Sequence, residues 1–309
     1  MNIITVDAGK FQTKCLYGNV GLRIRTKMEE VDGNIQVKDN GSFYIKWDND
    51  MYILGDGAKF VDYDISKHKL HHKLAIYSAS ASLLKENIVN PTNLVVLSPL
   101  SLYTNVQARE EFRQFILNNH SVKFELNSEH KNLLINDVTV FAEACGVPIS
   151  NPDKFKNKTV GLLDIGGLNV NGMIFKNMKP IKGTHFTENL GSLIVMEKIR
   201  KELNKEIKGA NIQEYQMDNI IKKGYYLADK ELSREIIKSL LSDHFKDILQ
   251  VAKASNWDIK GLDIVVSGGG SIDIGLSSIQ SYIPQTQISN DPVWDNCKGG
   301  SMVGEMIYG

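Results

Sequence analysis

The segment Val160–Phe175 places an aspartate and two glycines between two apolar runs. Asp164 follows the first run, and Gly166 and Gly167 form the turn before the second. Glycines allow a tight turn whose N–H groups can approach a polyanion, and a carboxylate beside them can hold Mg²⁺ through water. The segment therefore predicts a phosphate-binding hairpin, although taken alone it also fits a plain β-turn with a solvated aspartate.

The same arrangement occurs near the N-terminus. The apolar run Ile3–Val6 leads into Asp7, Gly9 and Lys14, and another strand-like run follows. The two hairpins are about one domain length apart. Their repetition indicates two similar halves of the molecule that close over one nucleotide.

A third glycine turn follows the apolar run Ile264–Val266 and spans Ser267–Ser271. Its three consecutive glycines are Gly268, Gly269 and Gly270. They remove side chains from a surface that a flat ligand approaches closely, or they form only a flexible turn.

Glu143 follows the apolar run Val138–Phe141 and precedes Gly146. One interpretation is a helix-start carboxylate, favoured there by the helix dipole. The other is a carboxylate in the cleft between the two hairpins that orients water against a γ-phosphate. Each motif is weak by itself, but the order D-x-G, Glu, D-x-G-G, S-G-G-G in one chain favours a nucleotide site.

The elements that must position these residues alternate between strands and helices. Turn dipeptides at Asp32–Gly33 and Asn40–Gly41, between short runs such as Ile35–Lys38, predict a small antiparallel subdomain. The patterns further predict strands over Asn93–Ser98, Lys131–Ile135 and Val138–Phe141, and a turn at Asn136–Asp137 joins the last two. They also predict helices over Asp64–Lys85, Asn105–Asn118, Glu188–Leu203 and Asp229–Ala254.

Three histidines, His68, His71 and His72, lie at helical spacing within the expected helix Asp64–Lys85. Two of them could share a face and bind a metal ion. No cysteine or carboxylate pair completes such a site, so we interpret them as part of a polar helix surface.

Composition narrows the class of protein. With 309 residues the chain is long enough for two cored domains. Lys plus Arg and Asp plus Glu number 36 each, and no basic excess or patch is visible, so we expect no direct contact with nucleic acid. The three cysteines, with no metal-type spacing, suit a reducing cytosol as small core residues. Without a long apolar run or a signal peptide, we expect a soluble cytoplasmic protein that does not bind membranes.

Together these motifs resemble the actin-like nucleotide-binding superfamily shared by actin, Hsp70 chaperones and sugar kinases. The nearest resemblance is to the ParM-type plasmid-segregation actins, carried by the segments NLVVLSPLSLY, INDVTVFAEACGVP and LLDIGGLNVNGMIF. The resemblance covers nearly the whole chain, and Asn296–Gly304 is similar to the second connecting segment.

The resemblance implies an α/β actin-like fold, with two similar ribonuclease H-like domains around a nucleotide cleft. Residues 1–155, with a β-rich insertion at about 20–75, would form domain I together with about 290–309, and 156–289 would form domain II.

It also implies a filament-forming NTPase that hydrolyses ATP or GTP with Mg²⁺. Asp7 and Asp164 would hold the metal through water, and Glu143 would position the attacking water. The phosphates would be cradled by Gly9, Lys14, Gly166, Gly167 and Asn169. The nucleoside would be surrounded by Gly268, Gly269, Gly270, Gly191 and Ser192, together with Lys222 and Lys223.

Two positions depart from the family's usual pattern. Lys10 replaces a small polar residue and either contacts phosphate or points to solvent, and Asn169 stands where threonine is commoner. The implied partners are further copies of the chain and a DNA-binding adaptor of the ParR kind. The alternatives are a small-metabolite kinase of the same superfamily and a scaffold filament that hydrolyses little.

Overall fold

A computed structural model describes residues 1–32, 41–60, 67–84 and 91–309. The chain divides into two compact units, unit 1 with Met1–Ser150 and Asn296–Gly309, and unit 2 with Asn151–Asp295. Three expectations fall wholly or partly outside the described residues. They are the run Ile35–Lys38, one residue of each turn dipeptide (Gly33 and Asn40), and both ends of the helix Asp64–Lys85.

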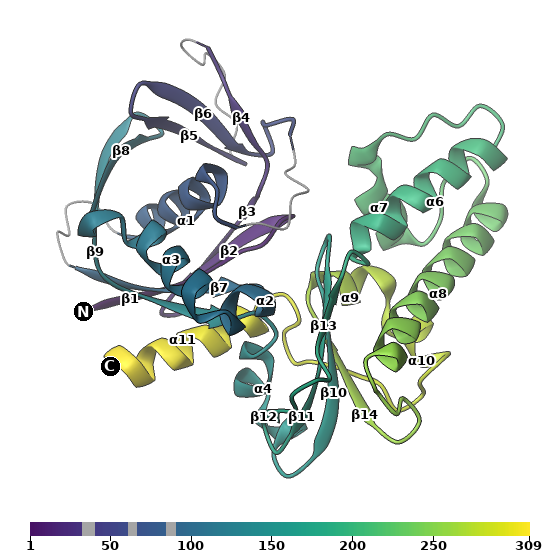
Figure 1. Ribbon diagram of the computed structural model, residues 1–309. Coiled ribbons are helices and arrows are strands. Elements are labelled where there is room, and N and C mark those ends of the chain that lie inside the picture. The colour runs from purple at the N-terminus through teal and green to yellow at the C-terminus, as the bar shows by residue number, and fades with distance from the viewer. Residues whose placement is uncertain (33–40, 61–66, 85–90) are drawn as a thin grey trace. The chain divides into compact units, whose positions relative to one another are not determined.

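Unit 1 is built on a mixed sheet with the strand order β3-β2-β1-β7-β9-β8-β5-β6-β4 (Figure 1). The strands are β1 (Asn2–Ala8), β2 (Gln12–Tyr17), β3 (Val20–Arg25), β4 (Met28–Glu30), β5 (Ser42–Trp47), β6 (Asp50–Gly55), β7 (Thr92–Ser98), β8 (Ser121–Leu126) and β9 (Glu129–Ala142). The helices are α1 (Leu70–Leu83), α2 (Leu100–Thr104), α3 (Val106–Leu117), α4 (Gly146–Ser150) and α11 (Asp295–Tyr308).

The central strands β1 and β7 are covered on both faces, which explains why most of the residues in their middle are apolar. Ile4 and Leu94 belong to the core cluster that includes the side chains of α1. On the other face, α11 approaches so closely that a Cβ on Gly300 would lie 2.8 Å from Thr5, and one on Gly304 2.7 Å from Ile3. Small residues on α11 therefore allow it to pack directly on the sheet.

Strand β9 corrects one expectation from the sequence. It runs without interruption from Glu129 to Ala142, whereas a turn was expected at Asn136–Asp137. Thr92 pairs with Ile135 and Asn93 with Asp137, so Asn136 is the extra residue of a β-bulge. Its amide donates to the side chain of Asn93 at 2.8 Å, which stabilises the bulge inside a continuous strand.

The histidines correct a second expectation. His71 and His72 are 8% and 0% exposed, and their rings lie 4.3 Å apart, so they are not a polar helix surface. His68 precedes α1 and lies against the ring of Phe115. Among the described residues no group of three or more potential ligands could hold a metal ion.

Unit 2 contains a second sheet with the order β12-β11-β10-β14-β15, and β13 pairs with β11. Its strands are β10 (Thr159–Ile165), β11 (Val170–Lys176), β12 (Lys179–Pro180), β13 (Phe186–Glu188), β14 (Asp263–Ser267) and β15 (Gln287–Ile288). Its helices are α5 (Pro152–Phe155), α6 (Ser192–Glu206), α7 (Met217–Lys223), α8 (Lys230–Ala254), α9 (Gly269–Ile274) and α10 (Leu276–Gln280).

Helices α6 and α8 contact each other and bury their apolar stripes in one core with the sheet. Helix α6 begins at Ser192, whereas the sequence placed its start at Glu188, because Glu188 pairs with Val170 as part of β13. In the described part of the chain, no helix is both long and apolar enough to cross a membrane.

Candidate functional site

In unit 1, the predicted aspartate and lysine of the first hairpin form an ion pair. Asp7 on β1 lies directly opposite Lys14 on β2, and its Oδ2 is 2.7 Å from the Lys14 Nζ. Burial opposes ionisation of Asp7, but Lys14 and then Lys67 outweigh it and hold the pKa of the carboxyl below its ordinary value. Asp7 is therefore an ionised carboxylate, the group that Mg²⁺ binds directly or through water.

The turn after Asp7 requires its glycine. A Cβ on Gly9 would lie 2.8 Å from the carbonyl oxygen of Gln12. The next residue, Lys10, is only 9% exposed, so its side chain does not point to solvent. Burial and the charge of His71 lower the pKa of the His72 ring, and the charge of Lys10 lowers it further. Lys10 thus adds a buried positive charge beside the first hairpin.

Glu143 directly follows β9, and its N–H donates to the carbonyl of Ser98 at 2.8 Å, next to the end of β7. Helix α4 begins three residues later, at Gly146. The carboxylate instead forms an ion pair with Lys67. Because β1, β7 and β9 are parallel neighbours, Asp7 and Glu143 both lie at the carboxyl-end edge of the sheet in unit 1.

Lys67 is a site residue that the sequence did not reveal. It is 3% exposed, and its Nζ donates to Glu143 and, at 3.4 Å, to the carbonyl of Leu97. It also lowers the pKa of Asp7. No motif surrounds Lys67 in the sequence. Its contacts with Leu97 on β7 and with Glu143 after β9 identify it.

In unit 2, the second hairpin and the start of α6 form one structure. The N–H of Gly166 donates to the carbonyl of Asn169 at 2.8 Å and closes the turn after Asp164. The N–H of Ser192 donates to the carbonyl of Gly166 at 3.0 Å. Asn169 therefore closes the turn through its backbone, and the hairpin holds the first residue of α6.

Gly191 makes this close approach possible. A Cβ there would lie 2.3 Å from the carbonyl oxygen of Gly167, so only glycine fits. The preceding carbonyl, of Leu190, accepts a hydrogen bond of 2.9 Å from Nε2 of His244 on α8. The predicted residues Gly166, Gly167, Gly191 and Ser192 are thus brought together, with His244 as a support that the sequence did not indicate.

The glycine turn before α9 lies against the same hairpin. Gly268 has φ +82°, and a Cβ there would be 2.2 Å from the carbonyl of Ile165 and 2.7 Å from Oδ1 of Asp164. A Cβ on Gly270 would be 2.7 Å from the carbonyl of Gly166. A Cβ on Gly269, by contrast, would meet no atom of the described residues within 4 Å. Of the three glycines, Gly269 alone is not crowded by the part of the chain that the structure describes.

Helix α7 carries the predicted residues Lys222 and Lys223, and it also carries Asp218 in its first turn. Lys222 and Lys223 are exposed in its last turn. Burial raises the pKa of Asp273 on α9, although its hydrogen bond with Ser192 acts in the opposite direction, and the charge of Asp218 raises it further. Lys222 shares a helix face with Asp218, four residues before it, whereas Lys223 does not.

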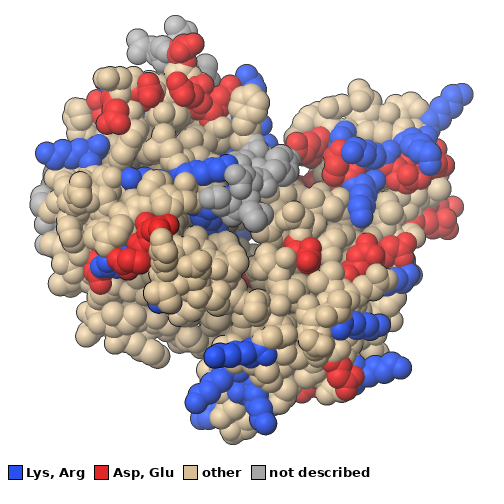
Figure 2. All heavy atoms as spheres, viewed as in Figure 1, with Lys and Arg blue, Asp and Glu red and all other residues tan. Residues whose placement is uncertain are grey.

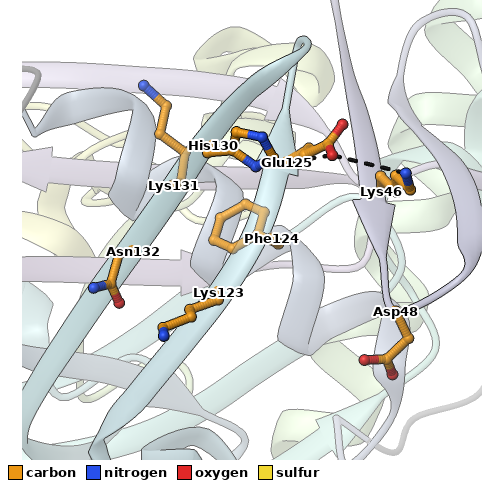
Figure 3. Close-up of a pocket in the computed structure, with 8 residues that line it drawn as sticks. All are labelled: Lys46, Asp48, Lys123, Phe124, Glu125, His130, Lys131 and Asn132. Carbon is orange, nitrogen blue, oxygen red and sulfur yellow. Dashed lines mark ion pairs between the residues drawn. The ribbon is translucent and has the colours of Figure 1, made fainter.

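A separate hollow in unit 1, of about 440 Å³, is lined by side chains of β5, β8 and β9 and their turns (Figure 3). Its charged groups are mostly exposed, and Lys46 points to Glu125 at 3.7 Å. None of the predicted site residues lines this hollow, so it is not the candidate site.

The surface charge corrects the expectation that no basic patch exists. Figure 2 shows acidic and basic side chains interspersed over much of each unit, with basic ones gathered near the turn between β11 and β12. Folding brings together lysines from two segments, 154–158 and 176–179, that are separate in the sequence. A net charge of zero therefore conceals a local basic cluster.

The chain is similar to known proteins of the actin-like fold. The family model "Actin like proteins N terminal domain" matches residues 5–146, and no curated protein matches the chain. An Alp12 filament structure is 27% identical, with a TM-score of 0.75, over 100% of this chain and 99% of that one.

Two further solved structures are similar over nearly their full length. A 15-stranded ParM filament from Clostridium botulinum is 16% identical, with a TM-score of 0.78 over 99% of both chains. Ta0583, an archaeal actin homolog in complex with ADP, is 15% identical, with a TM-score of 0.79 over 99% of this chain and 100% of that one. These findings confirm the actin-like fold and the resemblance to ParM-type proteins.

Proposed function

We propose that this chain, which has the actin-like fold, binds a nucleoside triphosphate with Mg²⁺, assembles into filaments and hydrolyses the nucleotide. The observation that carries the proposal is the edge of the sheet in unit 1. There, one ionised carboxylate, Asp7, and one lysine-held carboxylate, Glu143, follow neighbouring parallel strands. Phosphoryl transfer to water needs a metal-holding group and a water-orienting group of these types.

The residues present fit a magnesium nucleotide. Mg²⁺ is commonly bound by one or two carboxylates plus waters and substrate phosphates, and Asp7 and Asp164 would supply such carboxylates. When bound, the ion would neutralise charge on the phosphates. The backbone at Gly9 and at Gly166–Gly167 would cradle the phosphates, and Gly269 would leave room for the nucleoside.

Glu143 would accept a hydrogen bond from the attacking water and orient it. The ammonium of Lys67 holds that carboxylate in place, so it does not swing freely. Lys67 would therefore position Glu143 and add positive charge where the transferred phosphoryl group develops negative charge.

The similarity to ParM and Alp12 filament structures supports assembly of the chain with itself. By the same resemblance, the filament would move plasmid DNA through a separate DNA-binding adaptor of the ParR kind. This chain would then contribute the polymer and its hydrolysis cycle, and the adaptor would contribute DNA recognition.

The proposal is tested by light scattering and sedimentation with Mg²⁺ and ATP, GTP or no nucleotide, with released phosphate followed in parallel. Wild type should pellet only with nucleotide. Glu143→Gln should still pellet, with phosphate release reduced by about 10²–10⁴-fold. The matched control Glu125→Gln, in the β8 strand, should hydrolyse normally.

Three results would contradict the proposal or one of its parts. Nucleotide binding without any polymer would remove the filament function, and phosphate transfer that depends on an added small-molecule acceptor would indicate a metabolite kinase. Unchanged phosphate release by Glu143→Gln would remove the assigned role of that carboxylate.

A further inference from the structure

Unit 2 presents a cluster of lysines at one end of its sheet. We call it the basic patch, and its members are Lys154, Lys156, Lys158, Lys176 and Lys179. The N–H of Asn177 donates to the carbonyl of Lys158 at 2.8 Å, and the N–H of Asn157 donates to the side chain of Asn177 at 3.0 Å. These bonds hold the segments 154–158 and 176–179 side by side, and neither segment contains an acidic residue.

The basic patch carries an unfavourable arrangement within the chain itself. Lys176 and Lys179 are directly opposite each other across the β11–β12 ladder. Like charges in that position destabilise a strand pair. An opposing surface of negative charge would offset this cost, so the patch is suited to bind an anionic partner.

Unit 1 presents a cluster of the opposite sign. We call it the acidic patch, and its members are Glu30, Asp32, Asp48 and Asp50, which are all exposed. Glu30 pairs with Tyr52 across β4 and β6, and Trp47 pairs with Asp50 at the end of the β5–β6 hairpin. The N–H of Val31 donates to the carbonyl of Met51 at 2.9 Å, which brings Asp32 to the same end.

The side chain of Tyr52 lies beside these carboxylates, and its hydroxyl donates to Oδ2 of Asp50 at 3.5 Å. Burial raises the pKa of the Tyr52 hydroxyl, and so do the charges of Asp50, Glu30 and Asp48. The cation nearest to Asp48 along β5 is Lys46, whose side chain points to Glu125 (Figure 3). The acidic patch is visible at the upper end of unit 1 in Figure 2.

We propose that the acidic patch of one copy of this chain binds the basic patch of the next copy, as an electrostatic contact of the filament. The inference rests on the proposed function and deepens it, because it names residues that join the subunits. Two different surfaces that complement each other form a heterologous contact, which continues from copy to copy instead of closing as a dimer. Charge complementarity also steers the approach of subunits and fixes their register.

Charge reversal tests the contact with three variants. The first variant reverses the basic patch and is Lys156→Glu/Lys158→Glu/Lys179→Glu. The second reverses the acidic patch and is Glu30→Lys/Asp48→Lys/Asp50→Lys. The third is the control Lys208→Glu/Lys238→Glu/Lys253→Glu, which changes exposed lysines elsewhere on unit 2. Each is assayed for nucleotide-dependent pelleting at 50 mM and 500 mM NaCl (about 14 and 4 Å of screening length).

At 50 mM NaCl, each patch variant alone should require at least about tenfold more protein to pellet, because like charges then face each other. A mixture of the two should pellet like wild type, since each reversed patch meets its opposite on the other variant. The control should pellet like wild type. High salt should weaken the wild-type polymer and narrow the differences between variants.

The nucleotide affinity of each variant is measured as a control, and an affinity equal to that of the wild type would show that the fold is intact. A wild type that never pellets would remove the proposed function and this contact with it. If the wild type pellets and both patch variants pellet as it does, the contact alone would be overturned. The same would follow if the mixture of the two patch variants stays soluble. Loss of binding to duplex DNA by the first variant, with pelleting unchanged, would make the basic patch a nucleic-acid surface and would also overturn the contact.

Discussion

The ammonium of Lys67 forms an ion pair with the carboxylate of Glu143, 76 positions later in the chain. Both side chains are largely buried, at 3% and 14% exposure. Removing one member of a buried pair costs about 3–5 kcal/mol, while removing both costs less than the sum, because no buried charge loses its counterion. Lys67→Met and Glu143→Gln should therefore each lower the free energy of unfolding, and the double variant should recover part of the loss.

A double-mutant cycle by urea unfolding measures this coupling. The control is the exposed pair Lys205 and Glu202, whose side chains are 3.0 Å apart and whose cycle should give at most about 1 kcal/mol. Additive losses at Lys67 and Glu143 would show that the two charges act independently and would contradict the positioning role of Lys67.

The three glycines before α9 should respond differently to alanine. Gly268→Ala and Gly270→Ala should each destabilise unit 2 by about 1–3 kcal/mol, because the new Cβ would overlap backbone atoms of the second hairpin. Gly269→Ala should leave stability nearly unchanged but lower nucleotide affinity by about tenfold, because its methyl enters the space assigned to the nucleoside. Thermal unfolding and fluorescent-nucleotide titration separate the two effects. If Gly269→Ala binds nucleotide like wild type, the nucleoside lies elsewhere.

Acidification should destabilise the protein through His72. Burial, together with the charges of His71, Lys10, Lys67 and Lys69, lowers the pKa of His72 far below its ordinary 6.5. The native ring stays neutral while the unfolded ring binds a proton below about pH 6.5, so stability falls as the pH drops below that value. For one histidine, the loss between pH 7 and 5.5 is about 1 kcal/mol.

His72→Leu should remove this part of the pH dependence. Both ring nitrogens of His72 are buried and have no hydrogen-bond partner among the described residues, so the substitution should not destabilise the protein at pH 7. Urea unfolding at pH 7 and 5.5 provides the measurement, with the exposed His130→Leu as the control. Equal pH dependence in His72→Leu and wild type would contradict this account.

The last helix is fastened to the sheet of unit 1 through Tyr308. Its hydroxyl lies 2.9 Å from Oδ2 of Asp137 and 2.6 Å from Oγ1 of Thr139. Tyr308→Phe should lower stability by about 1 kcal/mol, since it removes hydrogen bonds from a partly buried network that includes Arg113. The control Tyr215→Phe, at an 82% exposed position, should not change the melting temperature. A loss of the same size in both variants would exclude a specific role for the Tyr308 hydroxyl.

The sequence by itself determined the fold class and the strands that carry the motifs. Runs such as Asn93–Ser98 and Ile264–Val266 lie in strands β7 and β14, because a largely apolar segment bounded by Pro or Gly is stable mainly as a covered strand. The glycine positions were also readable, because Gly191, Gly268 and Gly270 are required by close backbone approach, a constraint that leaves few other residue types.

Tertiary structure decided what depends on contacts between distant segments. The Asn136–Asp137 pair has the composition of a turn, but a hydrogen bond to Asn93 holds it as a bulge in β9. His71 and His72 look polar in sequence, yet α1 buries them in the core. Lys67, His244 and the basic patch carry no local signal at all. Their roles arise because an ion pair or a charge cluster depends on distance in space, which the order of residues along the chain does not specify.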